Sequence, residues 1–333
     1  MALVKTTLRI PEELHRQLRM TAGEQGMTSE EILREALQRE LDRLNAGKRR
    51  SDVSREIRDL LDLRVTTPSA FLAELFLQSM PAFAVIKDQE SRIRWANFFF
   101  EETLGASLAQ ARGKTISDLA GLEGRERERV ERNIAYVRES GAAQKAFEGL
   151  TLKNLGTLNI RAERFPLEQW DMFGDVSFIE RDIRVASFDV KSDVLLRMQR
   201  SSPDRMLEEM FPAFLRKAPV AIALKMPLVA ESDSIILWAN EQYVALTRNG
   251  RKKKTKKVQG ERTSSVFGIG SDHPLFQSEG EVVRTKKARI TKETLPDRGE
   301  RWSLRFPIFD EREKVEIIGV ISPNFEQEDE RTS

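Results

Sequence analysis

Two stretches of this chain carry the same pattern, in which an apolar strand runs through Trp-Ala-Asn into a helix-like segment. They are "SRIRWANFFFEETLG" at residues 91–105 and "DSIILWANEQYVALT" at residues 233–247. Asn97 and Asn240 stand where the strand becomes a helix, and asparagine caps helices well because its side-chain oxygen accepts an unpaired backbone N–H. Because the repeat includes strand, junction and helix, it predicts two copies of one domain.

Each copy has a proline-led strand before the repeat and three β-rich segments near its end. In the first copy these segments are "QKAFEGLTLK", "TLNIRAERFPL" and "DVSFIERDI". Apolar alternation runs through Ala162 and resumes one position out of step at Phe165, which predicts a β-bulge near Arg164. The second copy alternates cleanly through Trp302, Leu304, Phe306 and Ile308. The order of two strands, helices and three strands predicts an α+β fold, with a five-stranded antiparallel sheet and helices on one face in each copy.

This pattern resembles the PAS sensory domain, over residues 69–186 for the first copy and 204–324 for the second, with a linker at 187–203. The first copy follows the family pattern nearly throughout. The second departs from it, because "RNGRKKKTKK" replaces a helical connection and the helix before its last three strands is poor. The resemblance implies signal sensing or dimerisation, and it allows for a small-molecule ligand in the first copy.

The residue inventory narrows the cofactors that such a domain could hold. The chain has no cysteine and only His15 and His273, so we expect no metal site and no cysteinyl-flavin. Haem would need an axial histidine, and His273, predicted in a loop before Pro274, is the one candidate in these copies. A noncovalent flavin stays open, with Trp95 or Trp238 lining its pocket or packing in the core, as does a domain without any cofactor.

A lone strand opens the chain in "KTTLRIP", where Leu8 and Ile10 share one face and Lys5, Thr7 and Arg9 share the other. A helical stretch follows, and then Thr28 and Glu31 form a capping box that opens a second apolar-faced helix. A strand and two short helices bury too little surface to fold alone, and the strand has no partner nearby. Pairing with the same strand of a second chain solves both problems.

This arrangement resembles the ribbon-helix-helix DNA-binding fold of the Arc/MetJ type, over residues 1–45. The resemblance implies a ribbon swapped between two chains, with Lys5, Thr7 and Arg9 facing the bases of the major groove. It also implies that Thr28 and Ser29 hold a DNA phosphate at the start of the second helix. Auxiliary backbone contacts would come from Lys48, Arg49 and Arg50 in the linker of residues 46–68, and from the basic run at 251–257.

Two further segments are predicted to be helical. Ile57, Leu60, Leu61 and Leu63 indicate a short helix in the first linker that could pair with its symmetry mate. An apolar stripe with helical spacing precedes the second copy at Leu207, Met210, Phe211, Phe214 and Leu215. Pro212 predicts a kink in this second helix. Either helix could transmit strain between domains or pack on the adjacent sheet.

We therefore predict a cytoplasmic transcription regulator that binds double-stranded DNA as a homodimer or higher oligomer. No P-loop or nucleophile elbow is present, so we expect no enzymatic activity or catalytic residues. No apolar run approaches the roughly 20 residues that a membrane helix needs, and residues 325–333 are an acidic tail. Two alternatives remain: a protein-interaction module, antitoxin-like or docking a signalling partner, whose ribbon only dimerises, and a flavin-binding redox sensor.

Overall fold

The computed structural model divides the chain into two compact units, residues 1–52 and 53–333. It describes residues 16, 19–20, 22, 28–30, 55–62, 65–152, 156–179, 194, 197–198, 205–248, 258–295, 299–310 and 314–323. In the first unit, Ser29 and Glu30 are helical and Thr28 is not, which fits a helix that begins after Thr28. The predicted strand at Lys5–Pro11 lies outside the described residues.

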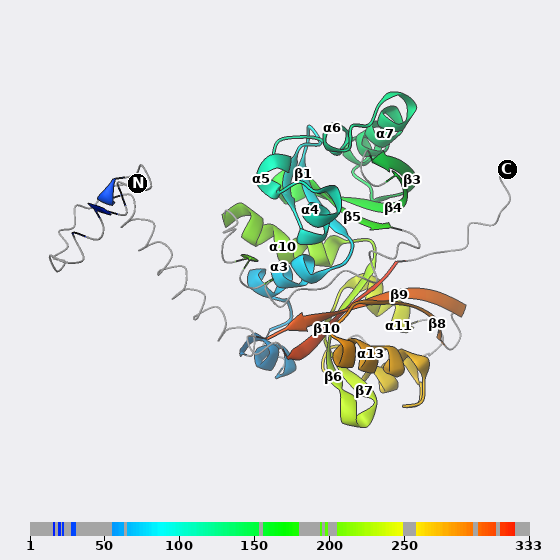
Figure 1. The fold of residues 1–333 in the computed structure, drawn as a ribbon. Helices are drawn as coiled ribbons and strands as arrows, with labels where there is room; N and C mark the ends of the chain where they lie inside the picture. The colour runs from blue at the N-terminus through cyan, green and yellow to red at the C-terminus, as the bar shows by residue number, and fades with distance from the viewer. Residues whose placement is uncertain are drawn as a thin grey trace. The chain divides into compact units, whose positions relative to one another are not determined.

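The first repeat forms a five-stranded antiparallel sheet with strand order β2-β1-β5-β4-β3 (Figure 1). Its elements are α3 (Ala70–Ser79), β1 (Phe83–Asp88), β2 (Ile93–Ala96), α4 (Phe98–Leu104), α5 (Leu108–Ala111), α6 (Ile116–Ala120), α7 (Gly124–Ser140), β3 (Gln144–Leu152), β4 (Gly156–Leu167), the 3-10 turn η1 (Glu168–Trp170) and β5 (Met172–Ile179).

The second repeat forms a sheet of the same size and connectivity, with strand order β7-β6-β10-β9-β8. Its elements are α10 (Arg205–Lys217), β6 (Ala221–Leu228), the 3-10 turn η2 (Val229–Glu231), β7 (Asp233–Ala239), α11 (Glu241–Arg248), α12 (Thr263–Phe267), α13 (Pro274–Thr285), β8 (Arg289–Leu295), β9 (Gly299–Phe309) and β10 (Val315–Ser322). The prediction of two α+β copies with five-stranded antiparallel sheets is confirmed.

The repeated asparagines explain why each copy begins with a helix fixed to its sheet. The Asn97 side chain accepts hydrogen bonds from the backbone N–H groups of Ala84 and Phe100, and donates to three backbone carbonyl oxygens between the last turn of α3 and β1. Asn240 makes the same five kinds of bond in the second copy. Both side chains are buried, and each one bonds five backbone groups, of which one is the N–H group at the start of the helix that it caps.

One row of residues crosses the outer face of the first sheet in register: Trp95 on β2, Ile86 on β1, Gly174 on β5 and Phe165 on β4. Helix α10, which precedes the second copy, lies on this row. The ring of its Phe214 lies 5.0 Å from that of Phe165. Phe211, one turn earlier, lies 5.0 Å from Trp95. The first sheet is therefore covered by the other copy's helix.

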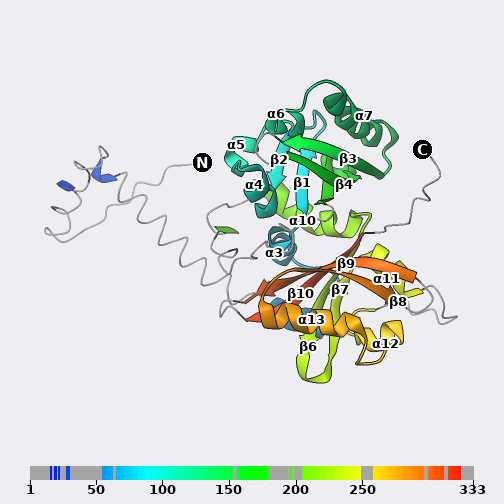
Figure 2. The ribbon, with the colours of Figure 1, turned by 45° about the vertical axis from the view of Figure 1, so that its right-hand side comes forward.

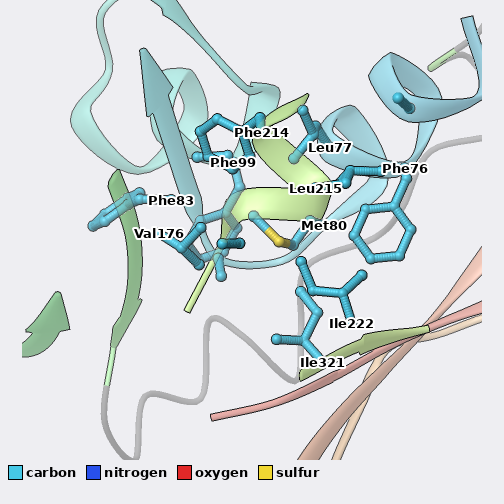
Figure 3. Close-up of a cluster of buried hydrophobic side chains, with 14 of the residues drawn as sticks. Phe76, Leu77, Met80, Phe83, Phe99, Val176, Phe214, Leu215, Ile222 and Ile321 are labelled. Carbon is cyan, nitrogen blue, oxygen red and sulfur yellow. The ribbon is translucent and has the colours of Figure 1, made fainter. Parts of the chain in front are cut away.

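The second sheet repeats this arrangement with the roles exchanged. Its row is Trp238, Leu224, Gly319 and Phe306. Phe76 of α3, the helix that precedes the first copy, packs edge-on against Phe306 with ring centroids 5.0 Å apart. Helices α3 and α10 contact one another between the two sheets (Figure 2). Figure 3 shows their aromatic and aliphatic side chains meeting those of both sheets in one continuous core.

Two predictions about individual segments need correction. Strand β4 pairs regularly with both neighbours through Arg164, so the bulge predicted there is wrong; both faces of the strand are buried there, which hides the alternation. The helix predicted to be poor before the last strands is α13, a 12-residue helix with Pro274 in its first turn. His273 caps it, because its Nδ1 accepts from the backbone N–H of Leu275.

The two helices predicted outside the sheets both form. Residues 55–61 are helical, and Ile57 and Leu60 are buried within the chain's own core. Gln259 of the second copy donates to the carbonyl oxygens of Leu60 and Val65, at 3.2 and 2.9 Å. This helix therefore packs on the second copy. In α10 the helix continues through Pro212 to Lys217.

Candidate functional site

A small cavity lies inside the first copy, between the inner face of the sheet and helices α4, α6 and α7. Its volume is about 30 Å³, room for about one or two water molecules. Most of its lining is apolar, and a polar group lies at the sheet: the lining residues are Phe83, Val85, Phe100, Leu104, Ile116, Ala120, Val130, Ile160, Glu148, Arg164, Asp175 and Ser177.

The polar part of the lining belongs to a buried network of four charged side chains. Lys87 donates to Asp175 at 2.7 Å, and Arg164 reaches Asp175 at 3.2 Å through Nε. The two terminal nitrogens of Arg164 donate to the two oxygens of Glu148, at 2.9 and 2.8 Å. Ser177 donates to the other oxygen of Asp175 at 2.5 Å. Two cations thus face two anions, and the network is neutral as a whole.

Sheet geometry places this network, because alternate residues of a strand point to opposite faces. Arg164 and Asp175 are cross-strand partners on the inner face, and the next residues along, Phe165 and Gly174, are partners on the outer face. Burial by itself would raise the pKa of Asp175, but the charges of Lys87 and Arg164 outweigh it and hold that pKa at about 2. Asp175 is therefore ionised at neutral pH.

The second copy has a corresponding network built with one different acid. Lys225 donates to Glu279 of α13 at 2.8 Å, and Arg305 pairs with Glu293. Strand β10 carries Val320 where β5 carries Asp175, which is why the acid comes from the helix instead.

A tyrosine occupies the interior of this second network. Tyr243 stands where the first copy has Phe100, and Lys225 Nζ lies 5.9 Å from the centre of its ring. Burial alone would lower the pKa of Lys225, but the charge of Glu279 raises it above the ordinary value. At the equivalent Lys87, burial outweighs Asp175 and the pKa is lowered.

A separate surface hollow of about 180 Å³ lies beside the β6–β7 turn of the second copy and the start of α13. Asp233 and Glu279 are its charged lining residues. Asp233 is already bonded to Ser234 and Ser264, and it lies 3.9 Å from Arg262. The hollow therefore differs from the first copy's cavity in position and in character.

The predicted site residues have different outcomes. Lys5, Thr7, Arg9, Lys48, Arg49, Arg50 and the basic run at 251–257 lie outside the described residues, so those assignments stay predictions. Thr28 is exposed and Ser29 is half-buried at a helix start. Trp95 lies on the face opposite the cavity, so the suggestion that it lines a flavin pocket is wrong; Trp238 holds the same place in the second sheet.

Sequence reasoning missed the buried charges. Two signals were available: Lys87 directly follows the apolar run "FAVI" at residues 83–86, and Arg164 stands where the apolar alternation breaks. Among the described residues, no group of three or more His, Asp or Glu side chains could hold a metal ion. Within that same part of the chain, no helix is both long and apolar enough to cross a membrane.

Comparison with known proteins assigns the fold of the first copy. A family model of the PAS fold matches residues 77–169. The PAS domain of the Cronobacter turicensis quorum-sensing receptor RpfR, solved in complex with C12:0, is 15% identical and covers 30% of this chain and 94% of its own, with a TM-score of 0.28.

Two further solved domains are similar. The PAS domain of Bordetella pertussis BvgS is 19% identical and covers 39% of this chain and 92% of its own, with a TM-score of 0.28. The PAS domain of a Haloarcula marismortui HTR-like protein is 16% identical and covers 32% and 92%, with a TM-score of 0.27. The sequence matches no curated protein. The first copy thus has the PAS fold, and the second copy shares its strand order.

Proposed function

We propose that this protein is a DNA-binding transcription regulator, without enzymatic activity of its own, whose paired PAS domains control how its N-terminal ribbon engages an operator. The observation that carries the proposal is the order of parts. A strand, turn and capped helix with Lys5, Thr7 and Arg9 on one strand face precede two sensory-type domains. The described helix start at Thr28 and Ser29 supports the capped second helix.

The first copy is the one we assign to sensing. Its cavity adjoins Arg164 and Asp175, which lie back to back with the residues that hold α10. A ligand larger than water would have to displace side chains, because ligand pockets are typically about 300–1,000 Å³. Binding would therefore be coupled to movement of α4, α6 or the sheet. A flavin would demand the largest rearrangement, and a colourless purified protein with full binding activity would exclude it.

The regulatory step follows from avidity. Dimers whose half-sites are spaced correctly bind adjacent sites together, so a change in how the sensory domains associate changes apparent affinity. Helix α3 is a suitable connector, since it follows the N-terminal unit and linker in the sequence and is buried between the two sheets.

A competing proposal is that the ribbon serves only to dimerise and that the sensory copies dock a protein partner. The observation that favours it is charge: residues 1–44 contain seven Lys or Arg and eight Asp or Glu, a net of −1. Nucleic-acid binders usually carry a clear positive patch. DNA binding by this unit would depend on local contacts from the strand and from Lys48, Arg49 and Arg50.

Gel-shift titration of the full chain against random and genomic duplexes, at two salt concentrations, separates the two proposals. We expect sequence-selective retardation that weakens with salt. Arg9→Ala should cost about 1–3 kcal/mol of specific binding and relax one base position. Arg16→Ala removes the same charge from an exposed helical residue and is the matched control. A dimer that retards no duplex selectively would support the interaction module.

A further inference from the structure

The outer faces of the two sheets differ at one equivalent pair of residues. In the first sheet, Glu163 on β4 is paired in register with Lys145 on β3. In the second sheet, the same positions hold Leu304 on β9 and Ile290 on β8. The positions are equivalent because each lies two residues before the aromatic ring that meets the other copy's helix, Phe165 in one case and Phe306 in the other. An ionisable pair thus replaces an apolar one.

Glu163 is fully buried, although it lies on the outward face of the sheet. Neither of its carboxylate oxygens has a hydrogen-bond partner among the described residues. Lys145 Nζ lies 3.7 Å from one of them, and its side chain is half exposed. A buried carboxylate without hydrogen bonds is costly to keep charged. Burial therefore raises the pKa of Glu163 to about 7, against the opposing charges of Lys145 and Arg161.

Within the described part of the chain, the charged groups near Glu163 lie on its own strand, on β3 and on α10. Arg161 stands on the same strand and Lys145 on β3, while the cross-strand neighbour on β5 is Val176. Helix α10 covers this face, and its charged residues with described side chains are Glu208, Glu209, Arg216 and Lys217. Among the described groups, only Lys145 and Arg161 act on the pKa of Glu163 by their charge. Lys217 forms an ion pair with Glu168, whose Oε2 lies 3.0 Å from Lys217 Nζ.

We propose that the seam between the first sheet and α10, meaning the packing of Phe165 and its neighbours on β4 against Phe214, responds to protons through Glu163. The seam between the second sheet and α3 has Leu304 at that place and does not respond. When Glu163 is protonated it is neutral and its buried position is tolerated. When Glu163 ionises, its carboxylate is stabilised by any opening of the seam that admits water or brings Lys145 closer. This inference goes beyond the proposed function and does not depend on DNA binding.

The sign of the effect follows from linkage. The pKa of Glu163 is about 7 in the folded protein, above its ordinary value of 4.5. Between these two pH values, the folded state therefore binds more protons than the state in which the seam is open. The packing at the seam is therefore most stable below pH 4.5. It becomes less stable as pH rises from 4.5 to about 7, and it changes little above that. Between about pH 6 and pH 8, the equilibrium constant for opening should rise about tenfold.

Hydrogen exchange of the full chain measures this directly, after correction for the intrinsic pH dependence of exchange. Peptides from β4 and α10 should lose about tenfold protection between about pH 6 and pH 8, while peptides from β9 and α3 should not. Glu163→Gln keeps the shape but cannot ionise, and it should remove the pH dependence. Glu163→Leu copies the second sheet and should do the same if the glutamine variant folds poorly. The proposal would be overturned if protection changed with pH in the same way in the wild type and in both variants.

Two further variants test the direction of the pH effect. Lys145→Met removes the nearest cation, so the pH at which protection falls should move upward. Leu304→Glu places a carboxyl at the equivalent position of the second sheet and should create pH-dependent exchange in β9 and α3. An unchanged midpoint in Lys145→Met would contradict the assignment of Glu163 as the responding group.

Discussion

In the first copy, Phe100 borders a cavity of about 30 Å³ beside Arg164 and Asp175, whereas in the second copy Tyr243 stands at the equivalent place with its ring beside Lys225. The outer faces differ as well: the first sheet has the ionisable Glu163 where the second has Leu304. Both copies keep the capping asparagine, the glycine under an aromatic ring and a buried neutral network. The two copies therefore share their backbone architecture, and they differ in that the first has the internal cavity and the buried ionisable residue on the outer face of its sheet.

The largest expected effect is the loss of a buried arginine. Arg164→Met would leave Glu148 and Asp175 with Lys87 as the cation remaining in their network, and Arg305→Met would do the same to Glu293 and Glu279. Breaking such a network costs about 3–5 kcal/mol, since it leaves uncompensated buried charge. Denaturant unfolding of the full chain measures it. Adding Glu148→Gln to Arg164→Met should recover part of the loss, and no recovery would mean that packing, not charge, is responsible.

A smaller effect is expected at the glycines beneath the aromatic rings. A Cβ at Gly174 would lie 2.5 Å from the ring of Phe165 and 2.9 Å from that of Phe214, and one at Gly319 would lie 2.3 Å from Phe306. Alanine at either position should destabilise by about 1–3 kcal/mol through overpacking. Gly280→Ala is the control, because its Cβ would meet open space in a helix and should stabilise by about 1 kcal/mol. Equal melting temperatures for Gly174→Ala and wild type would contradict this account of the seam.

The smallest effect concerns the hydroxyl that distinguishes the two interiors. Tyr243→Phe makes the second copy resemble the first and should cost about 1 kcal/mol, because the buried Lys225 loses the polar hydroxyl beside it. The reverse change, Phe100→Tyr, adds a hydroxyl beside the cavity that Arg164 and Asp175 also border, and it should cost less than that. Thermal unfolding of the two variants side by side tests the comparison. A larger loss for Phe100→Tyr would show that the cavity has no room for the added oxygen.

Local patterns predicted the frame well. The Trp-Ala-Asn repeat located both strand-to-helix junctions, because an asparagine cap leaves a short, recognisable signature. The stripe from Leu207 to Leu215 predicted α10 for the same kind of reason. The bulge predicted near Arg164 is wrong. Apolar alternation indicates strand register only when one face of the strand is exposed to solvent, and β4 is buried on both faces around Arg164. Helix α13 was underestimated, because its cap is the histidine His273 rather than a familiar capping residue.

The sequence by itself determined what is encoded within about twenty residues: which segments are strands, where helices begin and that the domain occurs twice. Only the tertiary structure decided that each leading helix covers the sheet of the other copy, through Phe214 on Phe165 and Phe76 on Phe306. It also decided that Lys87, Arg164 and Asp175 meet, from three different strands. Periodicity reports which face of an element is apolar, but the partner of that face is chosen by packing between residues distant in the chain.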